Sequence, residues 1–101
     1  MSRSIKDEFT DQLFSAILKL KNRKECYRFF EDIATVAEIK ALGQRLEVAK
    51  MLRTGATYDE ITEKTGVSTA TISRVKKSLY YGADGYSLIL DRMGYREENE
   101  E

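Results

Sequence analysis

The segment from Ser68 to Tyr81 carries residue types that bind polyanions. It holds three basic residues and no acidic one, in a chain whose formal net charge is 0. Cationic side chains neutralise phosphates, and small hydroxyl residues at the start of a helix let its backbone enter the DNA major groove. The predicted DNA-binding residues are Tyr58, Ser68, Thr69, Ala70, Thr71, Ser73, Arg74, Lys76 and Lys77. This pattern predicts contact with double-stranded DNA.

The order of these residues predicts a division of roles. The N-terminal residues of a recognition helix reach base edges, so Thr69 and Thr71 can bond to bases or phosphates. Arg74 can reach either guanine or phosphate. Lys76 and Lys77 come later and fit phosphate contacts, which add affinity without reading sequence.

Residues 57–81 have the layout of a helix-turn-helix, in which a short helix, a tight glycine turn and a second helix follow one another. Ile61 is the inward apolar residue of the first helix. Gly66 provides a turn with positive φ, and Ser68 caps the second helix. The inward residues of the second helix are Ile72, Val75 and Leu79. These anchors leave the predicted DNA-binding residues outside. Thr62 occupies a place where such motifs usually have alanine, so its hydroxyl must bond to a carbonyl or the helices must sit slightly apart.

The remaining segments also predict helices and no strand, because apolar residues recur at helical spacing between glycines and proline is absent. Capping boxes begin at Thr35 and Thr57. The expected helices cover about residues 5–21, 24–33, 35–54, 57–65, 68–81 and 84–93. The residues expected to face inward from the third helix are Ile39, Leu42, Leu46 and Ala49. The broad apolar stripe around Phe9 predicts a helix buried on more than one side, as in a tight dimer.

Length and composition predict one helical domain over residues 1–96 and an acidic flexible tail over 97–101. The first 96 residues hold 17 basic and 13 acidic groups, a balance of +4. Histidine is absent and Cys26 lies in an apolar stretch, so we expect no catalytic site, metal or cofactor. No apolar run approaches the 18 residues of a membrane span, and we expect a cytoplasmic protein.

Two stretches resemble the Trp repressor family, in particular its YerC/YecD-type branch. Ala41-Leu42-Gly43-Gln44-Arg45 is close to the family's A-L-G-x-R, and Ala70-Thr71-Ile72-Ser73-Arg74 matches its A-T-I-[ST]-R. The resemblance covers roughly residues 30–93. It implies a six-helix, intertwined homodimer that presents two helix-turn-helix units to a palindromic operator, with half-sites about one helical turn apart.

The resemblance also implies residues for an effector. In the namesake, L-tryptophan is held by two arginines with nearby threonine and serine groups, and the positions that match are Thr35, Arg45, Arg74 and Ser78. Val75, however, stands where the namesake has glycine beside the ligand ring, and Asp32 where an apolar residue is expected. We therefore expect no bound L-tryptophan. Some other small effector stays as an alternative.

The main hypothesis is a transcriptional regulator, with repression as the expected outcome. A helical adaptor that binds proteins is the alternative, since the net charge is neutral and an acidic tail is unusual beside a DNA surface. An enzyme is the least supported class, because the sequence has no constellation of catalytic residues.

Overall fold

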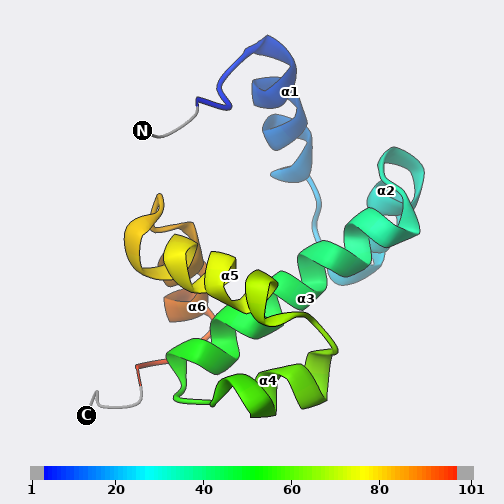
Figure 1. The fold of residues 1–101 in the computed structure, drawn as a ribbon. Coiled ribbons are helices and arrows are strands. Elements are labelled where there is room, and N and C mark those ends of the chain that lie inside the picture. Colours follow the sequence, from blue (N-terminus) through cyan, green and yellow to red (C-terminus); the bar gives the residue numbers. More distant parts are fainter. Residues whose placement is uncertain (1–3, 98–101) are drawn as a thin grey trace. The chain divides into compact units, whose positions relative to one another are not determined.

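The computed structural model describes residues 4–97, and over this range the chain is all-α, as predicted (Figure 1). The helices are α1 (Glu8–Ile17), α2 (Arg23–Ile33), α3 (Val36–Arg53), α4 (Tyr58–Thr65), α5 (Thr69–Tyr81) and α6 (Gly85–Arg92). None of the described helices is long and apolar enough to cross a membrane. The chain divides into two compact units between Ile39 and Lys40. Residues 98–101 of the predicted acidic tail lie outside the described range.

The N-terminal unit contains α1 and α2. The side chain of Asp7 accepts a hydrogen bond from the Thr10 backbone N–H at 2.7 Å, so α1 begins later than predicted. It also ends earlier, because the backbone beyond Ile17 tightens into i→i+3 hydrogen bonds. Neither helix contains a buried residue, and Phe9 and Leu18 are 81% and 83% exposed. These helices therefore bury little of their apolar surface within one protomer.

Both ends of α3 lie where the sequence predicts them. Thr35 and Glu38 form the predicted capping box, with backbone-to-side-chain distances of 2.8 and 3.1 Å. Gly55, just past the helix, has a φ of 94°. The prediction that Leu42 faces inward is wrong for the protomer, because this side chain is 54% exposed. The buried positions of α3 fall in its last two turns, where α4, α5 and α6 pack.

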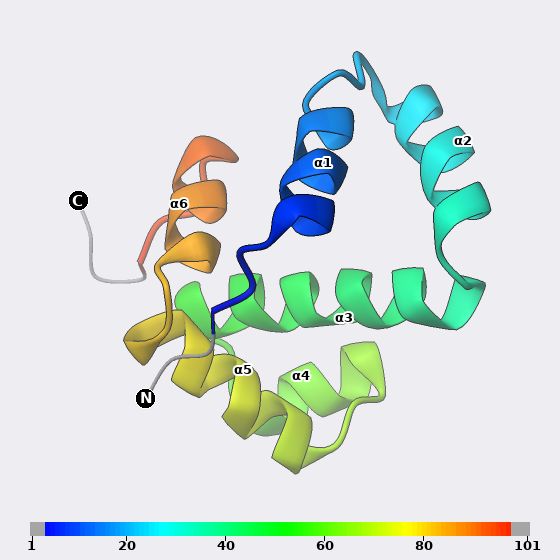
Figure 2. The ribbon, with the colours of Figure 1, turned by 90° about the horizontal axis from the view of Figure 1, so that it is seen from above.

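The C-terminal unit has one hydrophobic core. The buried residues are Val48 and Ala49 from α3, Ile61 from α4, Ile72, Val75 and Leu79 from α5, and Leu90 from α6. Figures 1 and 2 show α5 between α4 and α6. Because α5 contributes three of these residues, its inward face is fixed by contacts with every other helix of the unit.

A buried arginine ties α3 to α6. The Arg53 guanidinium forms an ion pair with Asp91 and donates a hydrogen bond to the Ser87 carbonyl at 3.4 Å. Lys50, one turn earlier, places its ammonium 5.0 Å from the centre of the Tyr95 ring. These contacts join the end of α3 to the end of α6 and the segment that follows it.

Candidate nucleic-acid interface

The predicted helix-turn-helix is present, with its turn at Gly66. Thr57 and Glu60 form a complete capping box at the start of α4. Gly66 has a φ of 75°, and its N–H donates to the Thr62 carbonyl at 2.8 Å. The Ser68 side chain then accepts a hydrogen bond from the Thr71 backbone N–H at 3.2 Å, which starts α5. Each of these local signals is confirmed.

The two helices pack without any special role for Thr62. Its side chain is exposed, and the hydroxyl makes no hydrogen bond within the described residues. Thr65 instead donates its hydroxyl to the Ile61 carbonyl at 2.7 Å, and Ile61 itself is fully buried. The Thr62 side chain therefore faces solvent, and the predicted bond from its hydroxyl to a carbonyl does not form among the described residues.

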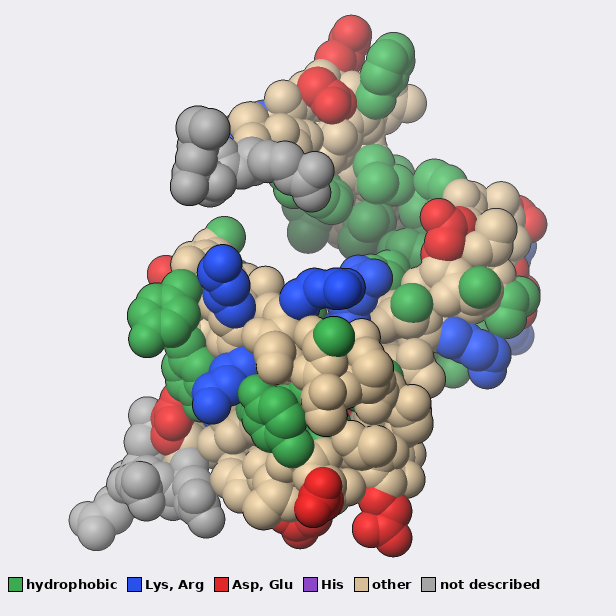
Figure 3. Space-filling model, viewed as in Figure 1, with side chains coloured by type: hydrophobic (Ala, Val, Ile, Leu, Met, Phe, Trp, Pro, Cys, Tyr) green, Lys and Arg blue, Asp and Glu red, His purple; other side chains and the backbone are tan. Residues whose placement is uncertain are grey.

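The buried and exposed faces of α5 separate as predicted. The exposed residues are Thr69, Ala70, Ser73, Arg74, Lys76 and Lys77. Figure 3 shows basic side chains spread over the face that carries α5, while acidic side chains on this face lie toward its edges. This exposed, acid-free side of α5 is called the basic face below.

Thr71 departs from the other predicted contact residues. Its side chain is half-buried, and its hydroxyl lies 3.2 Å from the Ser68 hydroxyl. The two hydroxyls therefore share a hydrogen bond at the start of α5. Thr71 helps to shape the helix start, while Thr69 and Ala70 beside it present their side chains to solvent.

Tyr58 extends the basic face onto α4. Its hydroxyl lies 3.5 Å from the Ser73 hydroxyl, and the Lys76 ammonium lies 5.9 Å from the centre of its ring. A cation over an aromatic face gains electrostatic attraction, and the contact also restricts the long lysine side chain. Three predicted residues from two helices are thus brought together.

Three of the predicted effector residues lie in the C-terminal unit, and one lies in the N-terminal unit. Thr35 belongs to the N-terminal unit, where it caps α3. Arg45, Arg74 and Ser78 are exposed, and no hydrogen bond joins these three within residues 4–97. Val75 is buried in the core rather than in an open slot.

Ser78 nevertheless lines a hollow of about 490 Å³. Its other lining residues are Leu46, Gly82, Ala83, Gly85, Tyr86 and Ile89. Burial raises the pKa of the Tyr86 hydroxyl, and the positive charge of Arg45 opposes that shift. Ser78 therefore lines the same hollow as Tyr86, and the charge of Arg45 acts on the Tyr86 hydroxyl.

Two polar residues of α3 that the sequence did not single out for the site also contact the helix-turn-helix. Gln44 and Glu47 of α3 bond to residues at the end of α4, and Lys64 is one of their partners. Gln44 lies within the A-L-G-x-R stretch, but at its variable position. Only the packing of α3 on α4 identifies these contacts. Among residues 4–97, no group of His, Cys, Asp or Glu is arranged to hold a metal ion.

Comparisons with known proteins agree with this architecture. The family model described as Trp repressor protein matches residues 8–94. The uncharacterized protein YerC of Bacillus subtilis (strain 168) is 61% identical over 83 residues, which cover 82% of this chain and 80% of YerC.

Two solved structures are similar over most of the chain. A crystal structure of a Staphylococcus aureus protein assigned to the Trp repressors has a TM-score of 0.87 and 55% identity, covering 92% of this chain and 93% of that one. A crystal structure of a TrpR-like protein from Eubacterium eligens ATCC 27750 has a TM-score of 0.88 and 57% identity, covering 92% and 96%. The chain belongs to the Trp repressor family of helix-turn-helix DNA-binding regulators.

Proposed function

We propose that the protein is a sequence-specific transcriptional repressor that binds a palindromic operator as a homodimer. The observation that carries this proposal is the basic face of α5, which is exposed and free of acids while the opposite side of the helix is buried. A helix held in this way presents its outer residues in a fixed orientation to the major groove. A DNA partner in turn favours a regulator acting in the cytoplasm rather than an enzyme.

The exposed apolar residues of the N-terminal unit support the homodimer. Phe9, Phe14 and Leu18 all lie on or next to α1 and are exposed in the protomer. Exposed apolar surface on this scale marks an interaction site. A second copy of the chain is the occupant that we propose, because a twofold dimer also places two basic faces toward one palindromic site.

The direct test is selection of bound sites from a random pool of duplexes at moderate salt. We expect one enriched, roughly palindromic motif, bound with a dissociation constant on the order of 10⁻⁸ M or tighter. Recovery of no enriched motif would contradict sequence-specific regulation.

Replacing Lys76 and Lys77 together by glutamine tests the phosphate contacts. Affinity should fall for all duplexes alike, and the slope of log K against log salt should become shallower by about 0.9 for each phosphate that is no longer neutralised. Lys19 and Lys24, exposed lysines of the N-terminal unit, provide the matched double glutamine control, which should leave the slope unchanged. Arg74→Ala should instead reduce the preference for the selected motif over random sequence.

The protein-binding adaptor is the alternative outcome of the same experiments. Duplex affinity no better than about 10⁻⁴ M at physiological salt, which is the weak end of non-specific binding, would favour the adaptor. Equal affinity of the parent and the Lys76/Lys77 variant would point in the same direction.

We further propose that repression does not use L-tryptophan. The position that matches the namesake's glycine is Val75, and its side chain occupies the protomer core. Titration calorimetry should show no saturable binding of L-tryptophan. Saturable binding in the micromolar range would contradict this proposal, and a loss of that binding in Ser78→Ala would locate it beside the hollow.

A further inference from the structure

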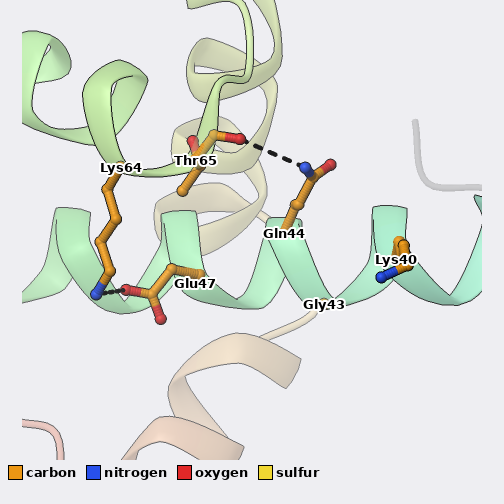
Figure 4. A pocket seen from close by; sticks show the side chains of 6 residues that line it. All are labelled: Lys40, Gly43, Gln44, Glu47, Lys64 and Thr65. Carbon is orange, nitrogen blue, oxygen red and sulfur yellow. Dashed lines mark hydrogen bonds and ion pairs between the residues drawn. The ribbon is translucent and has the colours of Figure 1, made fainter.

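A polar cleft lies between α3 and the C-terminal end of α4 and includes none of the predicted DNA-binding residues in its lining. Its volume is about 440 Å³. The residues that line it are Lys40, Gly43, Gln44, Glu47, Lys64 and Thr65. Figure 4 shows Gln44 and Glu47 of α3 facing Thr65 and Lys64 of α4 across it. The turn at Gly66 follows directly after this end of α4.

Gln44 bonds to the backbone at the turn. Its Nε2 donates to the Thr65 carbonyl oxygen at 3.4 Å. Thr65 is the last residue of α4, so its carbonyl has no acceptor role inside that helix. The Thr65 hydroxyl also accepts a hydrogen bond from the Val67 backbone N–H at 3.3 Å. Gln44 thus connects α3 to Thr65, whose hydroxyl bonds to Ile61 before the turn and to Val67 after it.

Glu47 makes the second connection. One carboxylate oxygen accepts from the Lys64 ammonium at 2.9 Å, and the other lies 3.0 Å from the Lys50 ammonium. Burial alone would raise the pKa of Glu47, but the hydrogen bonds from Lys64 and Lys50 outweigh burial and hold this pKa below its usual value. Glu47 is therefore charged near neutral pH and holds Lys64 against α3.

We infer that Gln44 and Glu47 are positioning residues, which fix the turn and thereby the direction in which α5 leaves it. The start of α4 is held by its capping box and its middle by the buried Ile61. At its last turn, the polar contacts to α3 are those of Gln44 and Glu47. A recognition helix reads bases only when it is oriented to within a small angle, so loosening its turn affects base reading more than phosphate attraction. This inference rests on the proposed DNA-binding function.

Glu47→Gln has two opposite effects on DNA affinity, one from the lost negative charge and one from the lost contact to Lys64, and these effects can be told apart. Removing an acid near DNA strengthens attraction to any duplex, whereas loosening the turn weakens binding to the selected operator alone. We expect the ratio of operator affinity to random-duplex affinity to fall about 2- to 10-fold in Glu47→Gln and in Gln44→Met. Lys40→Gln is the control, because Lys40 lines the same cleft and makes no hydrogen bond or ion pair in the described chain. It should leave this ratio unchanged.

Amide hydrogen exchange of the 101-residue chain without DNA gives the second measurement. Exchange at the Gly66 and Val67 amides should become faster in Gln44→Met and Glu47→Gln, while the Ile61 amide stays protected by the intact core. Unchanged exchange at these two amides, together with an unchanged affinity ratio, would overturn the inference. If the parent selects no operator, the proposed function fails. The exchange rates then still decide whether α3 fixes the turn.

Discussion

Arg53 is the one charged side chain that is buried among the described residues, and only some of its hydrogen-bond donors have an acceptor. It pairs with Asp91 and donates to the Ser87 carbonyl, but its Nε has no hydrogen-bond acceptor in the described chain. Buried guanidinium groups are tolerated when their charge is paired. The carboxylate of Asp91 therefore offsets the cost of burying the Arg53 charge.

Asp91→Asn should lower the free energy of unfolding by about 1–2 kcal/mol, because it removes the charge that faces the buried guanidinium. The expected cost is held to this range because the Asp91 side chain is itself 62% exposed, so water screens part of the pair. Urea unfolding followed by circular dichroism measures this difference. Glu63→Gln, an exposed acid on α4, should change stability by no more than about 0.5 kcal/mol. Equal effects of the two substitutions would mean that the pair contributes nothing.

Within the helices and turns, two glycines of the C-terminal unit differ in whether the backbone conformation requires glycine. Gly66 has a φ of 75°, a conformation that side chains other than glycine adopt at a cost. Gly43 lies inside α3, and a Cβ atom built there meets no atom within 4 Å beyond its chain neighbours and the backbone of its own helix. The first glycine is required by the backbone, whereas the second weakens the helix without a reason inside the protomer.

Alanine at these glycines should therefore give effects of opposite sign. Gly66→Ala should reduce stability by roughly 1–2 kcal/mol, because its conformation is left-handed. Gly43→Ala should increase stability by about 1 kcal/mol through helix propensity. Thermal unfolding of the two variants beside the parent is the measurement. Loss of stability or of the dimer in Gly43→Ala would show that a second molecule approaches α3 at this position.

The capping box of α4 predicts a pH dependence. Hydrogen bonds from Thr57, first from its backbone, lower the pKa of Glu60 below its usual 4.5. An acid with a lowered folded-state pKa stabilises the fold above its unfolded pKa, and this contribution disappears as the pH falls through the folded value. Glu60→Gln keeps the hydrogen-bonding shape but not the charge.

The difference in stability between the parent and Glu60→Gln should therefore be largest near neutral pH and should shrink below about pH 4.5. Comparing the two proteins removes the contributions of the other acids, which titrate in both. Chemical unfolding at a series of pH values measures the difference. A difference that stays constant down to acid pH would show that the charge of Glu60 does not matter.

At the scale of the whole molecule, the apolar surface of α1 predicts the oligomeric state. Phe9 and Leu18 are more than 80% exposed in the protomer. Burying one such side chain contributes about 1.5–3 kcal/mol, and a twofold interface uses each residue twice. Phe9→Ser or Leu18→Ser should therefore raise the dimer dissociation constant roughly 100-fold or more.

Sedimentation at a range of concentrations measures this constant. Lys19→Ser, a polar exposed residue of the same segment, is the control and should leave the dimer intact. A parent protein that sediments as a monomer at all concentrations would contradict the homodimer and the proposed palindromic operator together.

Local signals along the chain were enough to predict most of the helices and the helix-turn-helix. Five of the six helices begin at a residue whose side chain accepts a hydrogen bond from the first turn, and α3, α4, α5 and the turn at Gly66 lie where such signals predict them. Capping and positive-φ turns depend on residues within four positions of each other, so they can be recognised without knowing the fold. The anchors Ile61, Ile72, Val75 and Leu79 followed from the same local periodicity.

The packing of the helices against one another sets which polar residues are in contact and which apolar residues are buried. Leu42 is exposed while Arg53 is buried, although their spacing places both on the same face of α3 as Leu46 and Ala49, because the hydrophobic core reaches α3 only from Leu46 onward. The bond from Gln44 to Thr65 and the ion pair of Glu47 with Lys64 join residues 21 and 17 positions apart. Such contacts depend on how two helices cross, and no spacing along the chain encodes that angle.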